Sequence, residues 1–295
     1  MNIKPNFSNL LFVGLSLLIV SPRVRAQEPI KKSSSDQTAT GSSTQGQDDS
    51  KDLSKALANP IAALNIIPFQ IDYNDNLGVD GKGLNWTTKI QPVIPFAIND
   101  DWNLISRTIL SYTDQKDVTF PGRSESGLGD TVQSFFVSPN KPGPFGEIWG
   151  AGLVTLLPTA TDDLLGTEKW GIGPTAIVLK QEGPWTFGGL VNHIESVGGD
   201  NDRADVSQTY LQPFLSYVTE NQTTFSLSPE VTYDWEIEQW SIPINFEVKK
   251  LVMIGKAPIQ IGAGVRYWAD SPDNGPEGWG LRLSLTFLFP SGGKF

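Results

Sequence analysis

The sequence predicts an all-β fold, a transmembrane antiparallel up-and-down β-barrel of about twelve strands. Two observations carry this prediction: an export signal at the N-terminus, and evenly spaced strand-like segments in which apolar and polar side chains alternate. Side chains on a strand alternate between its two faces. In the segment 281–289 one face carries Leu281, Leu283, Leu285, Phe287 and Phe289, and the other carries Arg282, Ser284, Thr286 and, as the apolar exception, Leu288. An apolar face of this kind covers a core in a soluble sandwich, but faces lipid in an outer-membrane barrel.

Residues 1–26 have the features of a cleaved secretory signal peptide. Lys4 supplies a positive charge, residues 10–20 form a short uncharged apolar run, and residues 24–26 end in alanine before Gln27. This is the pattern of a signal sequence, and the run is too short for a membrane-spanning helix. Since no later segment offers the ~20 apolar residues of a helical span, a membrane-spanning mature chain must be a closed barrel.

The composition excludes several kinds of site. Cysteine is absent from the 295 residues, and His193 is the only histidine. Thiol chemistry and disulfides are therefore excluded, and we expect no metal site and no cofactor. Removal of Lys4, Arg23 and Arg25 with the signal changes the formal net charge from −10 to −13. So acidic a chain lacks the basic patches that nucleic acid requires.

Residues 27–58 are expected to be a disordered tether, because up to about residue 50 they are rich in Ser, Thr, Gln, Gly and Asp. Residues 52–58 could form a short helix that ends before Pro60, with Leu53 and Leu57 on one face. Two interpretations stay open for this helix: a disordered lead-in to the barrel, or a small plug against its mouth. The barrel itself is expected to occupy residues 59–295.

Strand-like segments alternate with turn signals throughout the predicted barrel. Short links at 99–101, 139–144, 181–184 and 219–222 alternate with mostly longer ones, as expected for periplasmic turns and outer loops. Two links depart from this alternation: 236–239 is short on the outer side, and 249–256 is long on the inner side. The predicted strands are near 66–74, 85–98, 102–113, 128–138, 147–157, 170–180, 185–196, 206–218, 223–235, 240–248, 257–269 and 279–289.

All nine tryptophans fall near the ends of predicted strands. Indole is amphipathic and favours the headgroup level of a membrane, so this placement predicts two aromatic girdles. Trp102, Trp149 and Trp185 follow inner turns. The others lie beside predicted outer loops: Trp86, Trp170, Trp235, Trp240, Trp268 and Trp279.

Alternation also predicts which charged side chains face the lumen, because an outward arginine at mid-bilayer is costly. Four acids and four bases on this inner face give no net field, and each could either pair across the interior or contact a solute. The predicted pore-lining residues are Asp72, Lys89, Arg107, Glu230, Asp234, Glu247, Arg266 and Arg282.

Four segments, near 128–138, 147–157, 170–180 and 185–196, carry apolar residues on both faces. Phe135 and Phe136, for example, are adjacent. Either local bulges shift the register or part of the lumen wall is apolar. The second alternative would suit a hydrophobic cargo, and the sequence does not decide between them.

Catalysis is not expected. His193 lies near the outer end of its predicted strand, with Ser196 and Ser207 close in sequence. An outer-membrane lipid hydrolase would need a serine and a histidine on the outer wall, oriented by a third polar group. No segment resembles a nucleophile motif, so His193 is interpreted as an interfacial residue.

Several segments together resemble a known family of outer-membrane barrels, labelled as transporters or as proteins of the meta-pathway of phenol degradation. The resemblance covers essentially residues 57–295 and implies a monomeric barrel for small, hydrophobic or aromatic compounds. It implies no residue-level site. The segments that carry it are residues 57–64, 90–96, 99–108, 157–161, 165–170 and 173–176.

The expected function is therefore an outer-membrane channel or transporter for passive uptake of small solutes, not an enzyme. The alternatives are a plugged structural or surface-binding barrel and, less favoured, the lipid hydrolase. The expected partners are outer-membrane lipid, a small solute and, during biogenesis, the barrel assembly machinery. A terminal aromatic such as Phe295 resembles the signal that this machinery reads.

Overall fold

The computed structural model describes residues 52–62, 64–255 and 257–289. The predicted signal peptide, the tether up to residue 51 and Phe295 lie outside this range. Among the described residues, no helix is both long enough and apolar enough to cross a membrane.

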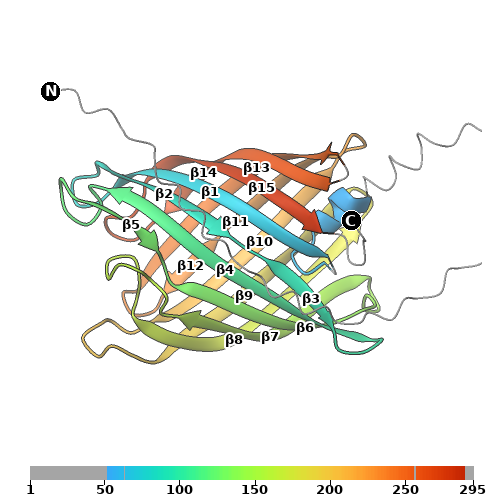
Figure 1. Cartoon of the computed structure of the whole chain (residues 1–295), viewed down its shortest axis with the longest axis horizontal. Coiled ribbons are helices and arrows are strands. Elements are labelled where there is room, and N and C mark those ends of the chain that lie inside the picture. Colours follow the sequence, from blue (N-terminus) through green and yellow to red (C-terminus); the bar gives the residue numbers. More distant parts are fainter. Residues whose placement is uncertain (1–51, 63, 256, 290–295) are drawn as a thin grey trace, which may run out of the picture. The chain divides into compact units, whose positions relative to one another are not determined.

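The described chain forms one antiparallel sheet closed on itself (Figure 1). Closure is completed by the pairing of β1 with β15 and of β9 with β10. The strands are β1 (Asn65–Leu77), β2 (Gly83–Ile90), β3 (Val93–Ala97), β4 (Trp102–Lys116), β5 (Ser124–Leu128), β6 (Thr131–Pro139), β7 (Glu147–Leu157), β8 (Lys169–Glu182), β9 (Trp185–Gly199), β10 (Ser207–Val218), β11 (Thr223–Pro229), β12 (Val231–Asp234), β13 (Gln239–Ile254), β14 (Ala257–Asp270) and β15 (Gly278–Phe289).

Three pairs of these segments are single strands with a local interruption, which gives the predicted twelve-strand barrel. β2 and β3 both pair with β1 and β4, β5 and β6 both pair with β4, and β11 and β12 both pair with β10 and β13. Proline at position 92 has no N–H to donate to a ladder. The ladder nevertheless continues, because the Thr108 N–H donates to the Pro92 carbonyl at 3.1 Å.

The two ends of the barrel differ, as expected. One end, here called the short-turn end, carries the links after β3, β6, β8, β10 and β13; the other, the loop end, carries the longer connections. The expected long inner link at 249–256 is wrong. β13 instead continues to Ile254, which pairs with Ala257 at the start of β14. Strands also run further toward the loop end than predicted, since β4 reaches Lys116 and β9 reaches Gly199.

The outer wall is apolar along its height. On β15, Leu281 and Leu283 remain 53% and 49% exposed, as lipid-facing side chains would be in the absence of lipid. Aromatic pairs mark both ends: Trp102 and Trp149 at the short-turn end have ring centroids 5.9 Å apart, and Tyr73 and Trp86 at the loop end are 4.7 Å apart.

Trp268 is the exception among the predicted girdle tryptophans. Its indole Nε1 donates to Asn74 Oδ1 at 2.9 Å, and the buried Arg266 guanidinium lies 4.7 Å from its ring centroid. Both partners are interior side chains. Trp268 therefore faces the lumen. Its ring makes a cation–π contact with the buried guanidinium of Arg266.

The lumen wall is apolar over the strands whose alternation was ambiguous. Phe136 is fully buried inside while Phe135 is exposed outside, and the β6 pairing with β7 continues without a shift from Thr131 to Val137. Leu288, the exception on β15, is buried in the same interior cluster. The buried members of this apolar cluster are Ile61, Ile66, Val93, Ile105, Phe136, Ile177, Leu179, Leu190, Leu251 and Leu288.

A charge on the outer wall tests whether that wall faces lipid. Replacing Leu283 by arginine should cost about 2–4 kcal/mol of unfolding free energy, the usual cost of arginine near the bilayer midplane. The same change at the exposed loop residue Val79 should cost almost nothing. Denaturant unfolding in phospholipid vesicles measures both, and equal values would contradict a lipid-facing wall.

Candidate functional site

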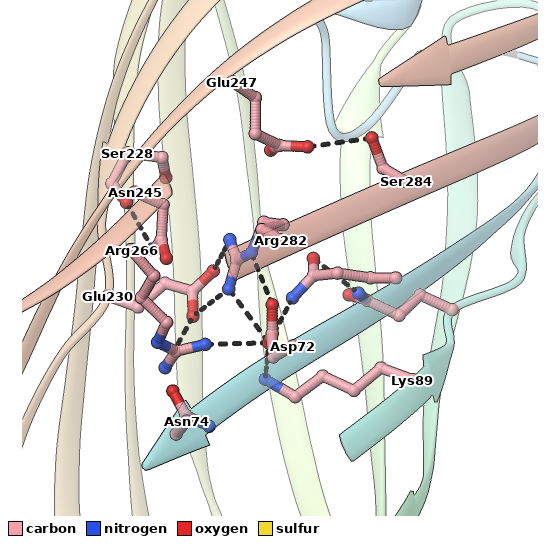
Figure 2. Close-up of polar contacts among 12 residues, drawn as sticks. Asp72, Asn74, Lys89, Ser228, Glu230, Asn245, Glu247, Arg266, Arg282 and Ser284 are labelled. Carbon is pink, nitrogen blue, oxygen red and sulfur yellow. Dashed lines mark hydrogen bonds and ion pairs between the residues drawn. The ribbon is translucent and has the colours of Figure 1, made fainter. Parts of the chain in front are cut away.

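A cluster of charged side chains lies inside the barrel, with the buried Arg282 at its centre (Figure 2). Arg282 Nε lies 2.7 Å from Asp72 Oδ1, and its Nη2 lies 3.1 Å from Asp72 Oδ2. Its Nη1 and Nη2 also donate to the two Glu230 carboxylate oxygens, at 2.8 and 3.2 Å. The planar guanidinium matches both carboxylates in forked geometry, the strong form of charged hydrogen bond.

Two further cations share these carboxylates. Arg266 Nη1 lies 2.7 Å from Asp72 Oδ2, and its Nη2 lies 3.8 Å from Glu230 Oε2. Lys89 Nζ lies 3.5 Å from Asp72 Oδ2. We call Asp72, Lys89, Glu230, Arg266 and Arg282 the central cluster.

Strand register places the central cluster. Asp72 on β1 is directly paired with Arg282 on β15, so both side chains leave the sheet on the same face and at the same height. Glu230 occupies the interruption between β11 and β12, where its N–H donates to the Pro243 carbonyl at 2.9 Å. The interruption thus directs a carboxylate inward without breaking the hydrogen bonding of the wall.

The other predicted pore-lining residues lie on the inner face but outside this cluster. Glu247 accepts from Ser284 Oγ at 2.8 Å and lies 3.0 Å from Lys249 Nζ. Asp234 accepts from Gln208 Nε2 at 2.8 Å. Arg107 donates to Gln91 Oε1 at 3.0 Å. The eight predicted residues therefore form one interlocked group and three separate positions, rather than a single paired network.

A cavity of about 240 Å³ lies beside the central cluster, inside the barrel. Its wall combines charged groups, amides, one tyrosine and three aliphatic side chains. The lining residues are Gln70, Lys89, Gln91, Arg107, Ile109, Val132, Ser134, Asn192, Ile194, Gln208, Tyr210, Gln212, Glu230 and Thr232.

Several of these lining residues were not predicted. Tyr210 and Gln212 come from β10, where Gln208–Phe214 has no clean apolar alternation. Val132 and Ile194 come from strands with apolar residues on both faces, whereas Ile109 comes from β4, where only the charged Arg107 was predicted to line the lumen. The pairing of Thr209 with the outward His193 would have placed Tyr210 inside, but that pairing is visible only in the folded sheet.

The N-terminal segment occupies the lumen at the short-turn end. A short helix at residues 52–57 lies there, shown in blue beside the end of β15 in Figure 1. Its Lys55 carbonyl accepts from Gln181 Nε2 at 2.8 Å, and Ser54 is fully buried. Ile61 belongs to the apolar cluster, with Leu53 and Leu57 packed against it. We call residues 52–62 the plug segment.

Side-chain contacts hold the connections at the loop end. Asp130, in the interruption between β5 and β6, accepts from the Thr167 N–H and hydroxyl, both at 2.6 Å. Lys169 Nζ donates to Asp205 Oδ1 at 2.8 Å, and this hydrogen bond holds the pKa of the Asp205 carboxyl below its usual value. These loops are therefore tied to neighbouring strands.

His193 lies on the outer wall in a polar cluster of the loop-end girdle. Its Nδ1 lies 2.9 Å from Thr209 Oγ1, and its Nε2 lies 3.3 Å from Glu195 Oε2. The hydroxyl within reach is thus a threonine, not Ser196 or Ser207. Trp235 Nε1 donates to the same Thr209 oxygen at 2.9 Å, which reduces its capacity to act as a nucleophile. This geometry favours the interfacial interpretation of His193.

No protein-family model and no curated protein sequence matches the chain. Solved outer-membrane barrels do match its structure. The COG4313 outer membrane channel from Pseudomonas putida F1 superposes with a TM-score of 0.60 at 16% identity, over 77% of this chain and 94% of that one. Outer membrane phospholipase A from Escherichia coli gives 0.44 at 10% identity, over 76% and 92%. The first likeness supports the fold of an outer-membrane barrel.

Removing one carboxylate from the central cluster should lower the free energy of unfolding of the barrel. Asp72→Asn leaves Arg282 and Arg266 buried with a single carboxylate, and breaking a buried pair in this way costs about 3–5 kcal/mol. Asp101→Asn, on an exposed turn, serves as the matched control and should change stability little. Equilibrium unfolding in detergent micelles, followed by tryptophan fluorescence, compares the two; similar small losses would show that the cluster is not stabilising.

Proposed function

We propose that the protein is a passive channel of the bacterial outer membrane for small solutes, exported by its signal peptide and held closed by its own N-terminal segment. The observation that carries this proposal is how the lumen is closed at the short-turn end. The closing element is the plug segment, a short peptide packed through Ile61, Leu53 and Leu57 against the barrel wall. The Gln181 amide also donates to its Lys55 carbonyl, and contacts of this kind can break without unfolding the barrel, whose own strands are hydrogen-bonded to one another.

The lumen supports passage rather than a sealed core. An internal cavity remains beside the central cluster, and it is lined mostly by polar side chains, as a solute-filled space requires. The apolar wall next to it suits solutes with a hydrophobic or aromatic part. We propose that such compounds are the cargo, that the barrel works as a monomer in lipid, and that it reaches the membrane through the assembly machinery.

A plugged structural barrel is the second candidate, and the central cluster favours it. Arg282 is 2% exposed and bound to two carboxylates, so it cross-braces β15, β1 and the β11–β12 junction. If the cluster leaves no path beside it, the barrel serves as a scaffold or surface receptor instead of a channel. The two candidates differ in whether removing the plug segment opens a path past the cluster.

Planar-bilayer recording of the mature protein and of Ile61→Asp separates these candidates. A buried carboxylate without a partner is expensive, so Ile61→Asp should release the plug segment from the apolar cluster. We expect small or rare conductance steps from the mature protein and larger, more frequent steps from the variant.

Val79→Asp, which adds the same charge to an exposed loop, is the matched control and should behave like the unaltered protein. Folded barrels that stay silent with Ile61→Asp would rule out the channel and leave the structural barrel.

A further inference from the structure

The cavity beside the central cluster has two chemically different sides. Ile109, Val132 and Ile194 form an aliphatic side, while Lys89, Arg107 and Tyr210 bring polar groups to the same space. We propose that this cavity binds a small amphipathic monoanion, a single carboxylate on a compact apolar body. This inference rests on the proposed solute-uptake function and names the class of solute.

Arg107 is the group that would bind the carboxylate. Its guanidinium lines the cavity, and within the described part of the chain its only hydrogen bond is to Gln91 Oε1, with no carboxylate in ion-pair range. Arg282, by contrast, is saturated by two carboxylates. A guanidinium carries several N–H donors and pairs with carboxylates in forked geometry. Arg107 therefore retains unused donors directed at a space large enough for a ligand.

The charge balance around the cavity also favours an anion. Asp72 and Glu230 are the carboxylates of the central cluster, and they face the cations Lys89, Arg266 and Arg282 with Arg107 nearby. Cations outnumber carboxylates, so the balance expected from all eight predicted residues does not hold locally. An unneutralised positive charge in a low-dielectric interior attracts an anion more strongly than it would in water.

Lys89 and Tyr210 add two donors to the same space. Lys89 keeps 27% of its side chain exposed, and its one ion pair among the described residues is the 3.5 Å contact with Asp72. For the Tyr210 hydroxyl, no hydrogen bond is made to any residue that the structure describes, although its ring packs against the apolar cluster. Both side chains are only partly buried, so their donors can reach a ligand in the cavity, and a bound carboxylate would supply a partner to each.

The aliphatic side of the cavity determines what the rest of the ligand, beyond its carboxylate, should look like. The volume of about 240 Å³ suits a compact body, and the three aliphatic side chains would remove its apolar surface from water. Glu230 also lines the cavity and is already bound to Arg282. A second carboxylate on the ligand would be repelled by it, which favours monocarboxylates over dicarboxylates.

Isothermal titration of the mature protein in detergent micelles tests this site with three probes. Benzoate has both the ring and the charge, benzamide has the shape without the charge, and acetate has the charge without the body. We expect saturable binding of benzoate, with benzamide and acetate each weaker by roughly tenfold or more. Benzamide binding as tightly as benzoate, or no binding of benzoate to the folded barrel, would overturn the proposal.

Substitutions of cavity residues test whether benzoate binds in this cavity. Arg107→Gln should weaken benzoate binding by roughly tenfold or more and leave benzamide unchanged, while Arg107→Lys should retain part of the affinity. Lys141→Gln, in the exposed connection between β6 and β7, also removes one positive charge, is the matched control and should leave the benzoate affinity unchanged. If Arg107→Gln does not fold, Ile194→Glu tests the same cavity, because an added carboxylate should abolish benzoate binding. Unchanged benzoate affinity in a folded Arg107 or Ile194 variant would contradict this placement.

Binding and conduction are measured separately, so their failures can be told apart. Benzoate binding by a barrel that never conducts would support this site and contradict the channel. Conduction without benzoate binding would support the channel and contradict this site.

Discussion

The position of Arg282 between Asp72 and Glu230 constrains most of the structure. The three residues come from β15, β1 and the junction of β11 with β12, so one guanidinium joins parts of the chain that are far apart in sequence. Buried charges are stable only when paired and hydrogen-bonded. Because side chains alternate between faces, a one-residue slip of β1 against β15 would turn Asp72 toward lipid and leave Arg282 without that partner. The central cluster thus specifies the register in which the barrel closes.

That register divides the lumen into parts with different chemistry. The central cluster lies on β1, β2, β14, β15 and the junction of β11 with β12. Phe136, Leu179 and Leu190 bring an apolar surface to β6, β8 and β9. The plug segment covers the apolar part at the short-turn end. The cavity remains where the charged and apolar parts meet. The packing of the plug segment, the ion pairs of the central cluster and the cavity all follow from how charged and apolar side chains are distributed over the inner face of one sheet.

Much of this architecture follows from the sequence because two-residue periodicity reports which face a side chain occupies. The strand count, the outward Leu281 and the inward Asp72 and Arg282 are all visible in the alternation of apolar and polar residues. Alternation fails for Phe135 and Phe136, because a lumen wall that is covered by a plug is as apolar as a wall that faces lipid. The same ambiguity hid Val132 and Ile194 as cavity residues.

The sequence could not predict which charged side chains contact one another. Alternation predicts the face that a side chain occupies, but neither its height along the barrel axis nor its position around the barrel. Asp234 and Glu247 share the inner face with Glu230, yet each has a different partner and lies away from the central cluster. Trp268 was assigned to a girdle from its place near a strand end, but its face is the inner one, next to Arg266. These outcomes depend on strand pairing, which is not a local property of the sequence.

The central claim is that a removable peptide closes this barrel, and a reversible lock tests it most directly. A Cβ placed on Gly150 would lie 3.4 Å from Ile61 Cδ1, and the chain has no cysteine of its own. Because Cδ1 lies two bonds beyond Cβ, a direct disulfide would need a shorter separation. In the double variant Ile61→Cys, Gly150→Cys, a short bis-methanethiosulfonate reagent should instead link the plug segment to β7 through two reducible disulfides. We predict that current across a planar bilayer is blocked while this cross-link is intact and rises when a reductant is added. A current that is the same before and after reduction would contradict closure by the plug segment.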